Sequence, residues 1–394
     1  MKDKMQWKTK LGIYMISQII TMLGSSIVSL SIIWYITLQT NSEISVAGIT
    51  ITTFLPQALI MLVGGVIADR FPVKRIIILS DVFIAGATLC LALLYFLGYQ
   101  SIVWIYIFNT LRSLGTGIQL PASKSILPLF ISEEQLLCAN SYSTSIWSII
   151  QLISPGLGGL ALSLLPLGGI YLIDVISAVI GVTLLAIIPI KNNLTKQTAS
   201  SMRLLKDGFL YLKQTKIIRN IIILYTVFQF LIVPASQLTP LLASIHLGNE
   251  VWILSGIEIA FSIGALVASL ILGYKKIVTS HYRLIAYSAS IFGITMCLII
   301  ILKHIPLFFI TMVIMGIGSP LYYTPLITMI QENSAPEYMG RMFSYIDLFG
   351  TLATPCGMLL FGPLSTINIE SSFLLPGIGM MVLGAYIFFK SRIT

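Results

Sequence analysis

Long apolar stretches alternate with short polar breaks along almost the whole chain. Segments such as 76–78 and 221–224 are apolar at every position, so they lack the alternation of a membrane-spanning strand. A helix crosses the roughly 30 Å hydrocarbon core of a bilayer in about 20 residues. The pattern predicts twelve transmembrane helices, at 11–38, 44–68, 76–97, 101–121, 139–164, 168–190, 217–243, 251–273, 283–302, 306–330, 340–363 and 372–389.

The longest polar break divides these helices into six and six. It predicts an N-terminal six-helix bundle at 1–190, a cytoplasmic central loop at 191–216 and a C-terminal six-helix bundle at 217–394. Within the loop, the amphipathic stretch 202–212 is expected to lie along the membrane surface. The predicted fold class is an all-α membrane protein built from two six-helix pseudo-repeats, and such repeats are typical of secondary transporters.

Composition narrows the function classes. With 57% hydrophobic and 9% charged residues, the chain fits no soluble globular protein. It has no phosphate-binding loop, so an ATP-driven pump is not expected. The four cysteines and three histidines form no metal-ligand pattern, and no nucleophile site is readable. We expect neither an enzyme nor a protein with a cofactor or a metal.

The net charge of +9 is a topology signal rather than a sign of nucleic-acid binding. If both termini are cytoplasmic, 21 of the 23 Lys and Arg residues fall in cytoplasmic segments, as the positive-inside rule requires. The exceptions are Lys303, which lies outside, and Arg112, which lies within a span. We therefore expect a multi-pass protein with both termini in the cytoplasm.

A short charged turn separates the second and third predicted helices. Gly permits close approach of helices, and Asp caps a helix N-terminus, so the turn suits a packed cytoplasmic latch. The alternative is a solvated turn that only obeys the positive-inside rule. The turn resembles the G-x-L-a-D-r-x-G-r-K signature of the major facilitator superfamily, at Gly65, Asp69, Arg70 and Lys74, with Arg75 as a further basic residue and Pro72 where the family usually has Gly.

Further patches resemble the drug-exporting branch that includes the Mef-type macrolide efflux proteins. They are spread over both halves of the chain, and they include 112–116, 133–136, 173–175, 257–261 and 336–344. The resemblance implies the major facilitator fold, a bacterial cytoplasmic membrane, a small amphiphilic substrate and the proton as coupling ion. We expect the chain to work as a monomer in the lipid bilayer.

The fifth predicted helix carries proline and small residues, which predict a kinked, closely packed helix. The segment is similar to the end of the antiporter motif of family exporters. Its members are Pro155, Gly156, Gly158 and Gly159.

Ionisable side chains inside spans are functional-site hypotheses by default. Arg112 lies near the middle of span 4, which lines the central cavity in the resembled family. Glu258 has apolar neighbours that suit reversible protonation or capture of a drug amine, and Asp347 has either a similar role or a pairing with Arg341. For Asp81 and Asp174, which lie near helix ends, a structural role is favoured.

Aromatic side chains in the spans are candidates to line a drug cavity, although core packing or contact with lipid is the alternative for each. The candidates are Trp34, Phe54, Phe228, Tyr322 and Tyr323. Together these features predict a proton-coupled exporter of a bulky, macrolide-like drug that works by alternating access. The alternatives are export of a peptide, siderophore or lipid-like metabolite, and a non-transporting scaffold or receptor.

Overall fold

The computed structural model of the chain describes residues 7–131, 133–190, 201–274 and 280–390. Every regular element in these ranges is a helix, so the prediction of an all-α protein is confirmed. The chain forms two compact units. Unit 1 comprises Met1–Tyr35 and Thr52–Met202, and unit 2 comprises Ile36–Ile51 and Arg203–Thr394.

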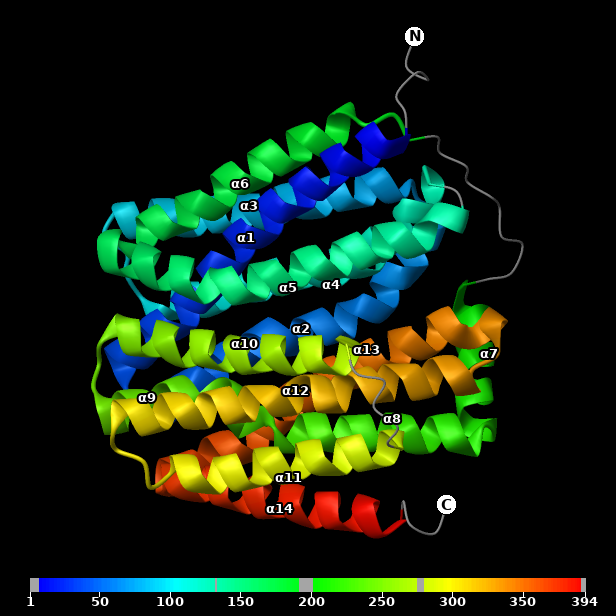
Figure 1. Cartoon of the computed structure of the whole chain (residues 1–394). Coiled ribbons are helices and arrows are strands. Elements are labelled where there is room, and N and C mark those ends of the chain that lie inside the picture. Colours follow the sequence, from blue (N-terminus) through cyan, green and yellow to red (C-terminus); the bar gives the residue numbers. More distant parts are fainter. Residues whose placement is uncertain (1–6, 132, 191–200, 275–279, 391–394) are drawn as a thin grey trace. The chain divides into compact units, whose positions relative to one another are not determined.

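The first half of the chain contains six long helices. They are α1 (Trp7–Thr40), α2 (Glu43–Arg70), α3 (Val73–Phe96), α4 (Ile102–Ser125), α5 (Glu133–Leu164) and α6 (Leu167–Ile187). In unit 1, α3 packs along both α4 and α6 (Figure 1). The end of α1 and the start of α2 belong to unit 2, where Asn41 contacts Ser244 and Thr50 contacts Gln237.

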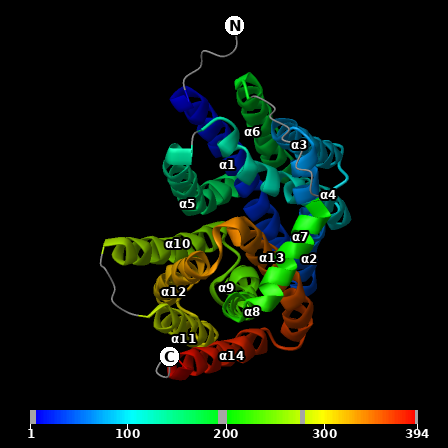
Figure 2. The same ribbon diagram turned by 90° about the vertical axis from the view of Figure 1, so that its right-hand side faces the viewer.

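The second half begins with α7 (Ser201–Gln214). It continues with α8 (Lys216–Leu231), α9 (Thr239–Leu247), α10 (Val251–Tyr274), α11 (His281–Ile299), α12 (Ile305–Asn333), α13 (Pro336–Ile367) and α14 (Ile369–Lys390). Within unit 2, α10 packs along α12 and α11 packs along α14 (Figure 2). Because α8 and α9 form one span, the described chain has six long helical segments on each side of α7.

Ten helices among the described residues are long and apolar enough to cross a membrane, and α5 contributes the shorter apolar stretch Ile149–Leu164. The remaining long helix is α4, which buries Asn109, Arg112 and Ser113. Polar groups inside a membrane helix are favourable only where neighbouring helices satisfy them. The polar composition of α4 therefore marks a helix that is specialised for contacts inside unit 1.

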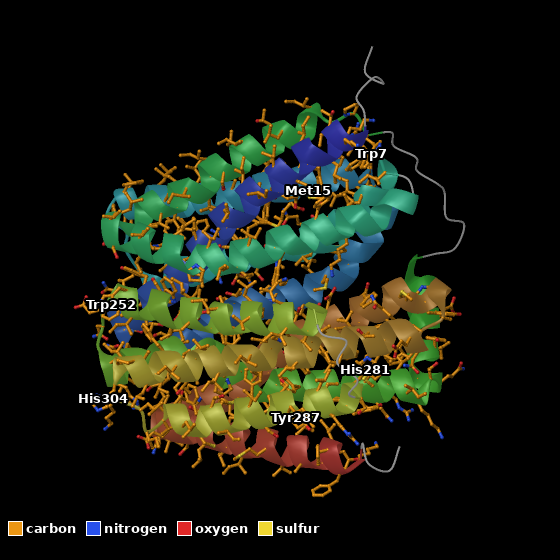
Figure 3. The ribbon with its side chains drawn as sticks, viewed as in Figure 1. Trp7, Met15, Trp252, His281, Tyr287 and His304 are labelled. Atoms are coloured by element: carbon orange, nitrogen blue, oxygen red, sulfur yellow. The ribbon has the colours of Figure 1, made fainter. Side chains whose placement is uncertain are left out.

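Helices that follow one another in the sequence of unit 2 run in opposite directions. Trp252 and His304 lie together at one end of the unit, at the starts of α10 and α12, whereas His281 starts α11 at the other end (Figure 3). Short connections between long membrane helices require this alternation.

The seventh span, Lys216–Leu247, is interrupted in its middle. A π-helical turn, Pro234–Leu238, separates α8 from α9. Proline removes a backbone donor from the helix, and two nearby hydroxyl groups bond to backbone carbonyls of this interrupted stretch. Thr239 Oγ1 donates to the carbonyl of Ala235 at 2.6 Å, and Ser236 Oγ donates to that of Val233 at 3.1 Å.

The amphipathic helix α7 is attached to the start of α13 by aromatic contacts. The rings of Tyr211 and Tyr338 are stacked with centroids 4.2 Å apart, and the backbone N–H of Ala335 donates to the Tyr211 hydroxyl at 3.0 Å. The guanidinium of Arg341 lies 5.0 Å from the Tyr338 ring centroid. From Arg203 on, α7 is part of unit 2.

Two glycines let α10 and α12 approach closely. A Cβ atom at Gly264 would lie 1.9 Å from the carbonyl oxygen of Val313, and one at Gly316 would lie 2.0 Å from that of Phe261. Small residues at such crossings are the usual basis of tight packing between membrane helices.

We expect Gly264→Ala to lower the free energy of unfolding in detergent by about 1–3 kcal/mol, because the added methyl group separates two packed backbones. Gly86→Ala is the matched control, since a Cβ atom there meets nothing within 4 Å. The control should be neutral or slightly stabilising, as alanine favours helix over glycine. Equal losses in both variants would contradict the proposed backbone contact.

Candidate functional site

A buried ion pair lies in the core of unit 1. Arg112 Nη1 on α4 is 3.0 Å from Asp174 Oδ2 on α6, and the exposed fractions of the two side chains are 7% and 2%. Opposite charges attract strongly where water is excluded, but bringing both out of water also costs much free energy. A buried pair is therefore weak evidence for stability and stronger evidence for a specific role.

Hydroxyl groups from two further helices complete the cluster. Ser25 Oγ on α1 donates to Asp174 Oδ1 at 2.8 Å, and Thr88 Oγ1 on α3 donates to Asp174 Oδ2 at 3.1 Å. Arg112 Nη1 also donates to Thr88 Oγ1, at 2.9 Å. Asp174 thus connects α1, α3, α4 and α6, and we call these four residues the ion-pair cluster.

Close packing of α1 against α6 places this cluster. A Cβ atom at Gly24 would lie 1.9 Å from Ser177 Oγ, one helical turn from Asp174. Ser17 Oγ donates to the carbonyl of Gly181 at 2.9 Å on the same pair of helices. The small side chains therefore bring Ser25 within reach of the Asp174 carboxylate.

Sequence reasoning singled out Arg112 and favoured a structural role for Asp174, whereas Ser25 and Thr88 were missed. The structure pairs Asp174 with Arg112. The pairing could have been inferred from the sequence, because Arg112 and Asp174 both lie in apolar spans and charges in membrane spans commonly pair with one another. Which helices are neighbours was not readable from the pattern.

The polar face of α4 continues one turn from Arg112. Asn109 Nδ2 donates to Thr53 Oγ1 at 2.7 Å and to Thr52 Oγ1 at 3.3 Å, both on α2. Ser113 Oγ donates to the backbone carbonyl of Thr53. Helix α4 is thus bonded to α2 as well as to α3 and α6.

The turn between α2 and α3 is described in part. The side chains of Gly65, Asp69 and Arg70, at the end of α2, lie outside the described residues. Lys74 Nζ donates to the carbonyls of Ala186 at 2.8 Å and Ile188 at 2.7 Å, where it caps the C-terminus of α6.

The two remaining positions of this turn are described. Pro72 precedes the first residue of α3, a position where a fixed φ is well tolerated. Arg75 is exposed on the first turn of α3.

The proline and glycine residues of α5 pack against α1. Pro155 lies inside the helix, and the carbonyl of Gly158 accepts a hydrogen bond from Ser31 Oγ at 3.5 Å. A Cβ atom at Gly158 would meet Leu30 and Trp34 at 3.6 and 3.7 Å. Gly156 and Gly159 belong to the same helical stretch.

Unit 2 holds the other two predicted ionisable groups. Glu258 lies on α10 and is half-buried; no hydrogen bond or ion pair to its carboxylate is found among the described residues. Asp347 lies on α13, close enough to the hydroxyl groups of Tyr225 and Tyr323 for electrostatic interaction. The two carboxylates therefore have different surroundings.

Most of the predicted cavity aromatics lie in packed cores. Phe228 and Tyr322 are stacked with centroids 3.6 Å apart, and the Tyr322 hydroxyl donates to the carbonyl of Tyr225 at 3.0 Å. Trp34 is fully buried in unit 1. Phe54 is half-buried, and Tyr323 is 52% exposed, so these two keep accessible rings.

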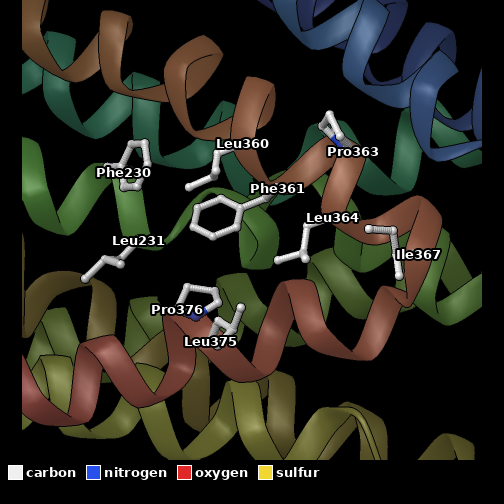
Figure 4. Close-up of a pocket in the computed structure, with 9 residues that line it drawn as sticks. All are labelled: Phe230, Leu231, Leu360, Phe361, Pro363, Leu364, Ile367, Leu375 and Pro376. Carbon is white, nitrogen blue, oxygen red and sulfur yellow. The ribbon is translucent and has the colours of Figure 1, made fainter.

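An apolar cavity of about 500 Å³ lies between α8, α13 and α14 (Figure 4). Its walls include Phe230, Phe361, Leu364 and Pro376. It contains none of the predicted ionisable groups. Leu360 and Leu375 at the edge of the cavity are exposed. Exposed leucines are typical of a helix surface that faces hydrocarbon.

We expect Asp174→Asn to lower the free energy of unfolding in detergent by about 3–5 kcal/mol, because it leaves the guanidinium of Arg112 buried without a counter-charge. Adding Arg112→Gln should recover most of this loss, since the neutral pair removes the uncompensated charge. The measurement is a double-mutant cycle by chemical denaturation. Additive losses in the double variant would show that the pair is not coupled.

Comparison with known proteins gives the family. The family model described as "Transmembrane secretion effector" matches residues 8–394. The chain is 30% identical to macrolide efflux protein A of Streptococcus pyogenes, over 94% of this chain and 93% of that protein. It is 31% identical to macrolide efflux protein A of Enterococcus faecalis, over 79% of this chain and 98% of that protein.

Solved structures give the fold. A POT family transporter in complex with a thioalcohol-conjugated peptide aligns with a TM-score of 0.75 over 98% of this chain and 96% of that chain. At 14% identity this likeness shows the fold alone. The predicted major facilitator fold and the predicted resemblance are thereby confirmed. The chain is a membrane transporter that belongs to the transmembrane secretion effector family of the major facilitator superfamily, in the branch of the Mef-type macrolide efflux proteins.

Proposed function

We propose that the chain exports bulky amphiphilic drugs of the macrolide class in exchange for protons, by alternating access. In this proposal the bundles 1–190 and 217–394 rock around a site near the bilayer midplane of a bacterial cytoplasmic membrane. Both termini face the cytoplasm, and the monomer is the working unit. The substrate class rests on the relatives, which are named for macrolide efflux.

The observation that carries the proton coupling is Glu258. Its carboxyl group lies within an apolar helix, and no described residue pairs with it. A membrane carboxyl group without a fixed partner can take up a proton or bind the amine of a cationic drug. Because one carboxylate holds either the proton or the amine, the two ligands compete, and this competition couples their movements.

The other ionisable groups have supporting roles in this proposal. Asp347 is within electrostatic range of Tyr323, and a carboxylate with an accessible aromatic ring suits a lipophilic cation. Arg112 affects coupling through its pairing with Asp174, which ties α4 to α6. The signature between α2 and α3 acts as the cytoplasmic latch, and its Lys74 also anchors α6.

The test is efflux of a labelled macrolide from a drug-hypersensitive bacterium that expresses the chain, with and without a protonophore. We expect efflux that the protonophore stops. Glu258→Gln should lose the protonophore-sensitive efflux, because glutamine neither takes up a proton nor offers a negative charge to an amine. Glu370→Gln is the matched control, because Glu370 lies exposed on the first turn of α14, and it should export normally.

Other outcomes point to other functions. Protonophore-sensitive efflux of a peptide, a siderophore or a lipid-like metabolite, without macrolide efflux, would keep the exporter and replace the substrate. Unchanged activity of Glu258→Gln would remove this residue from coupling. No efflux of any of these compounds would favour the non-transporting scaffold or receptor.

A further inference from the structure

Asp81 is a buried acid that the proposed function does not use. It lies on α3 with 6% of its surface exposed. Gln119 Nε2 on α4 donates a hydrogen bond to its Oδ1 atom. No cation pairs with Asp81 among the described residues: Lys74 is bonded to the end of α6, and Arg75 is exposed.

Asp81 lies on the same helix face as the ion-pair cluster. Asp81 and Thr88 are seven residues apart on α3, and Gln119 and Arg112 are seven residues apart on α4. Seven residues are two helical turns, or about 10 Å. Helices α3 and α4 therefore contact each other through polar side chains at two heights. Thr88 bonds to Arg112 at one height, and Asp81 bonds to Gln119 at the other.

The two carboxyl groups interact. Asp81 is close enough to Asp174 for a repulsive electrostatic interaction, and the hydroxyl of Tyr14 on α1 is also within electrostatic range of Asp81. Other titratable groups on the packed helices include Arg112 and Lys124 on α4, Tyr95 on α3 and Tyr171 on α6. The carboxylate of Asp174 pairs with Arg112 and accepts hydrogen bonds from the hydroxyls of Ser25 and Thr88. The carboxyl group of Asp81 accepts a hydrogen bond from the amide of Gln119. Asp81 can thus exchange a proton without breaking an ion pair.

A second observation points to water or protons in this core. The hydroxyl of Tyr171 is buried and has no hydrogen-bond partner among the described residues, and the rings of Tyr171 and Tyr95 pack edge-on with centroids 5.6 Å apart. Tyr171 is one turn from Asp174, and Tyr95 is two turns beyond Thr88. Buried hydroxyl groups in native proteins are normally satisfied, often by an internal water molecule.

We propose that Asp81 is a proton-binding site within unit 1, distinct from Glu258, whose occupancy is sensed by the Arg112–Asp174 pair. A proton on Asp81 removes the repulsion between the two carboxylates and leaves the ion pair intact. Loss of that proton restores the repulsion between Asp81 and Asp174, which is the partner of Arg112. The use of this site in coupling rests on the proposed function, but the site itself does not.

The test is an infrared pH titration of the purified full chain in lipid, which reads the C=O stretching band of protonated carboxyl groups. It needs no substrate, so it stays informative if macrolide export fails. We expect a titrating band that Asp81→Asn removes and that Glu370→Gln leaves in place. Glu258→Gln should remove only a separate component of the band.

Gln119→Leu is the second variant, because it keeps the carboxyl group and removes its amide donor. We expect it to shift the midpoint of the Asp81 band, and thermal denaturation checks that each variant is folded. A spectrum that Asp81→Asn leaves unchanged in a folded protein would overturn the proposal. So would a midpoint that is the same in Gln119→Leu and in the original chain.

Discussion

Hydrocarbon offers no hydrogen bonds, and this constraint shapes every part of the molecule. Each backbone group must be bonded within its own helix, and a buried polar side chain is favourable where its own helix or a neighbouring one supplies a partner. In unit 1 the constraint is met at the Arg112–Asp174 pair, where hydroxyls from α1 and α3 complete the coordination of the carboxylate. Removal of Asp174 leaves Arg112 without a counter-charge in this buried core.

The two units solve the same packing problem with different chemistry. The described core of unit 1 holds its helices together through polar contacts, with α4 bonded to α2, α3 and α6. Unit 2 relies on glycine-mediated backbone contact between α10 and α12, and on stacked rings at Phe228 and Tyr322. Each unit also carries an acid inside its spans, Asp81 in unit 1 and Glu258 in unit 2. Protonation is therefore expected to act on both units.

The helices could be predicted from the sequence because twenty apolar residues in a row have few alternatives in a membrane. The predicted span 168–190, for example, corresponds to α6 at Leu167–Ile187. The π-helical turn at Pro234–Leu238 could not be predicted, because the two prolines near it are equally compatible with a simple kink.

The partners of the charged residues could not be predicted. Periodicity places Arg112 and Asp174 on faces of their helices, but it does not say which helices meet. The sequence motif likewise predicted Lys74 as part of a cytoplasmic latch. In the structure the Lys74 side chain also caps the C-terminus of α6. Whether an aromatic residue such as Trp34 lines a cavity or packs in a core could not be predicted either, because its burial depends on residues far away in the sequence.

The central claim is that the Arg112–Asp174 pair is kept for transport rather than for stability. The most direct test combines Arg112→Gln and Asp174→Asn in one chain and measures energised drug efflux from cells that contain equal amounts of folded protein. The account predicts a protein that folds but no longer exports against a gradient. Protonophore-sensitive efflux at the original rate would contradict it.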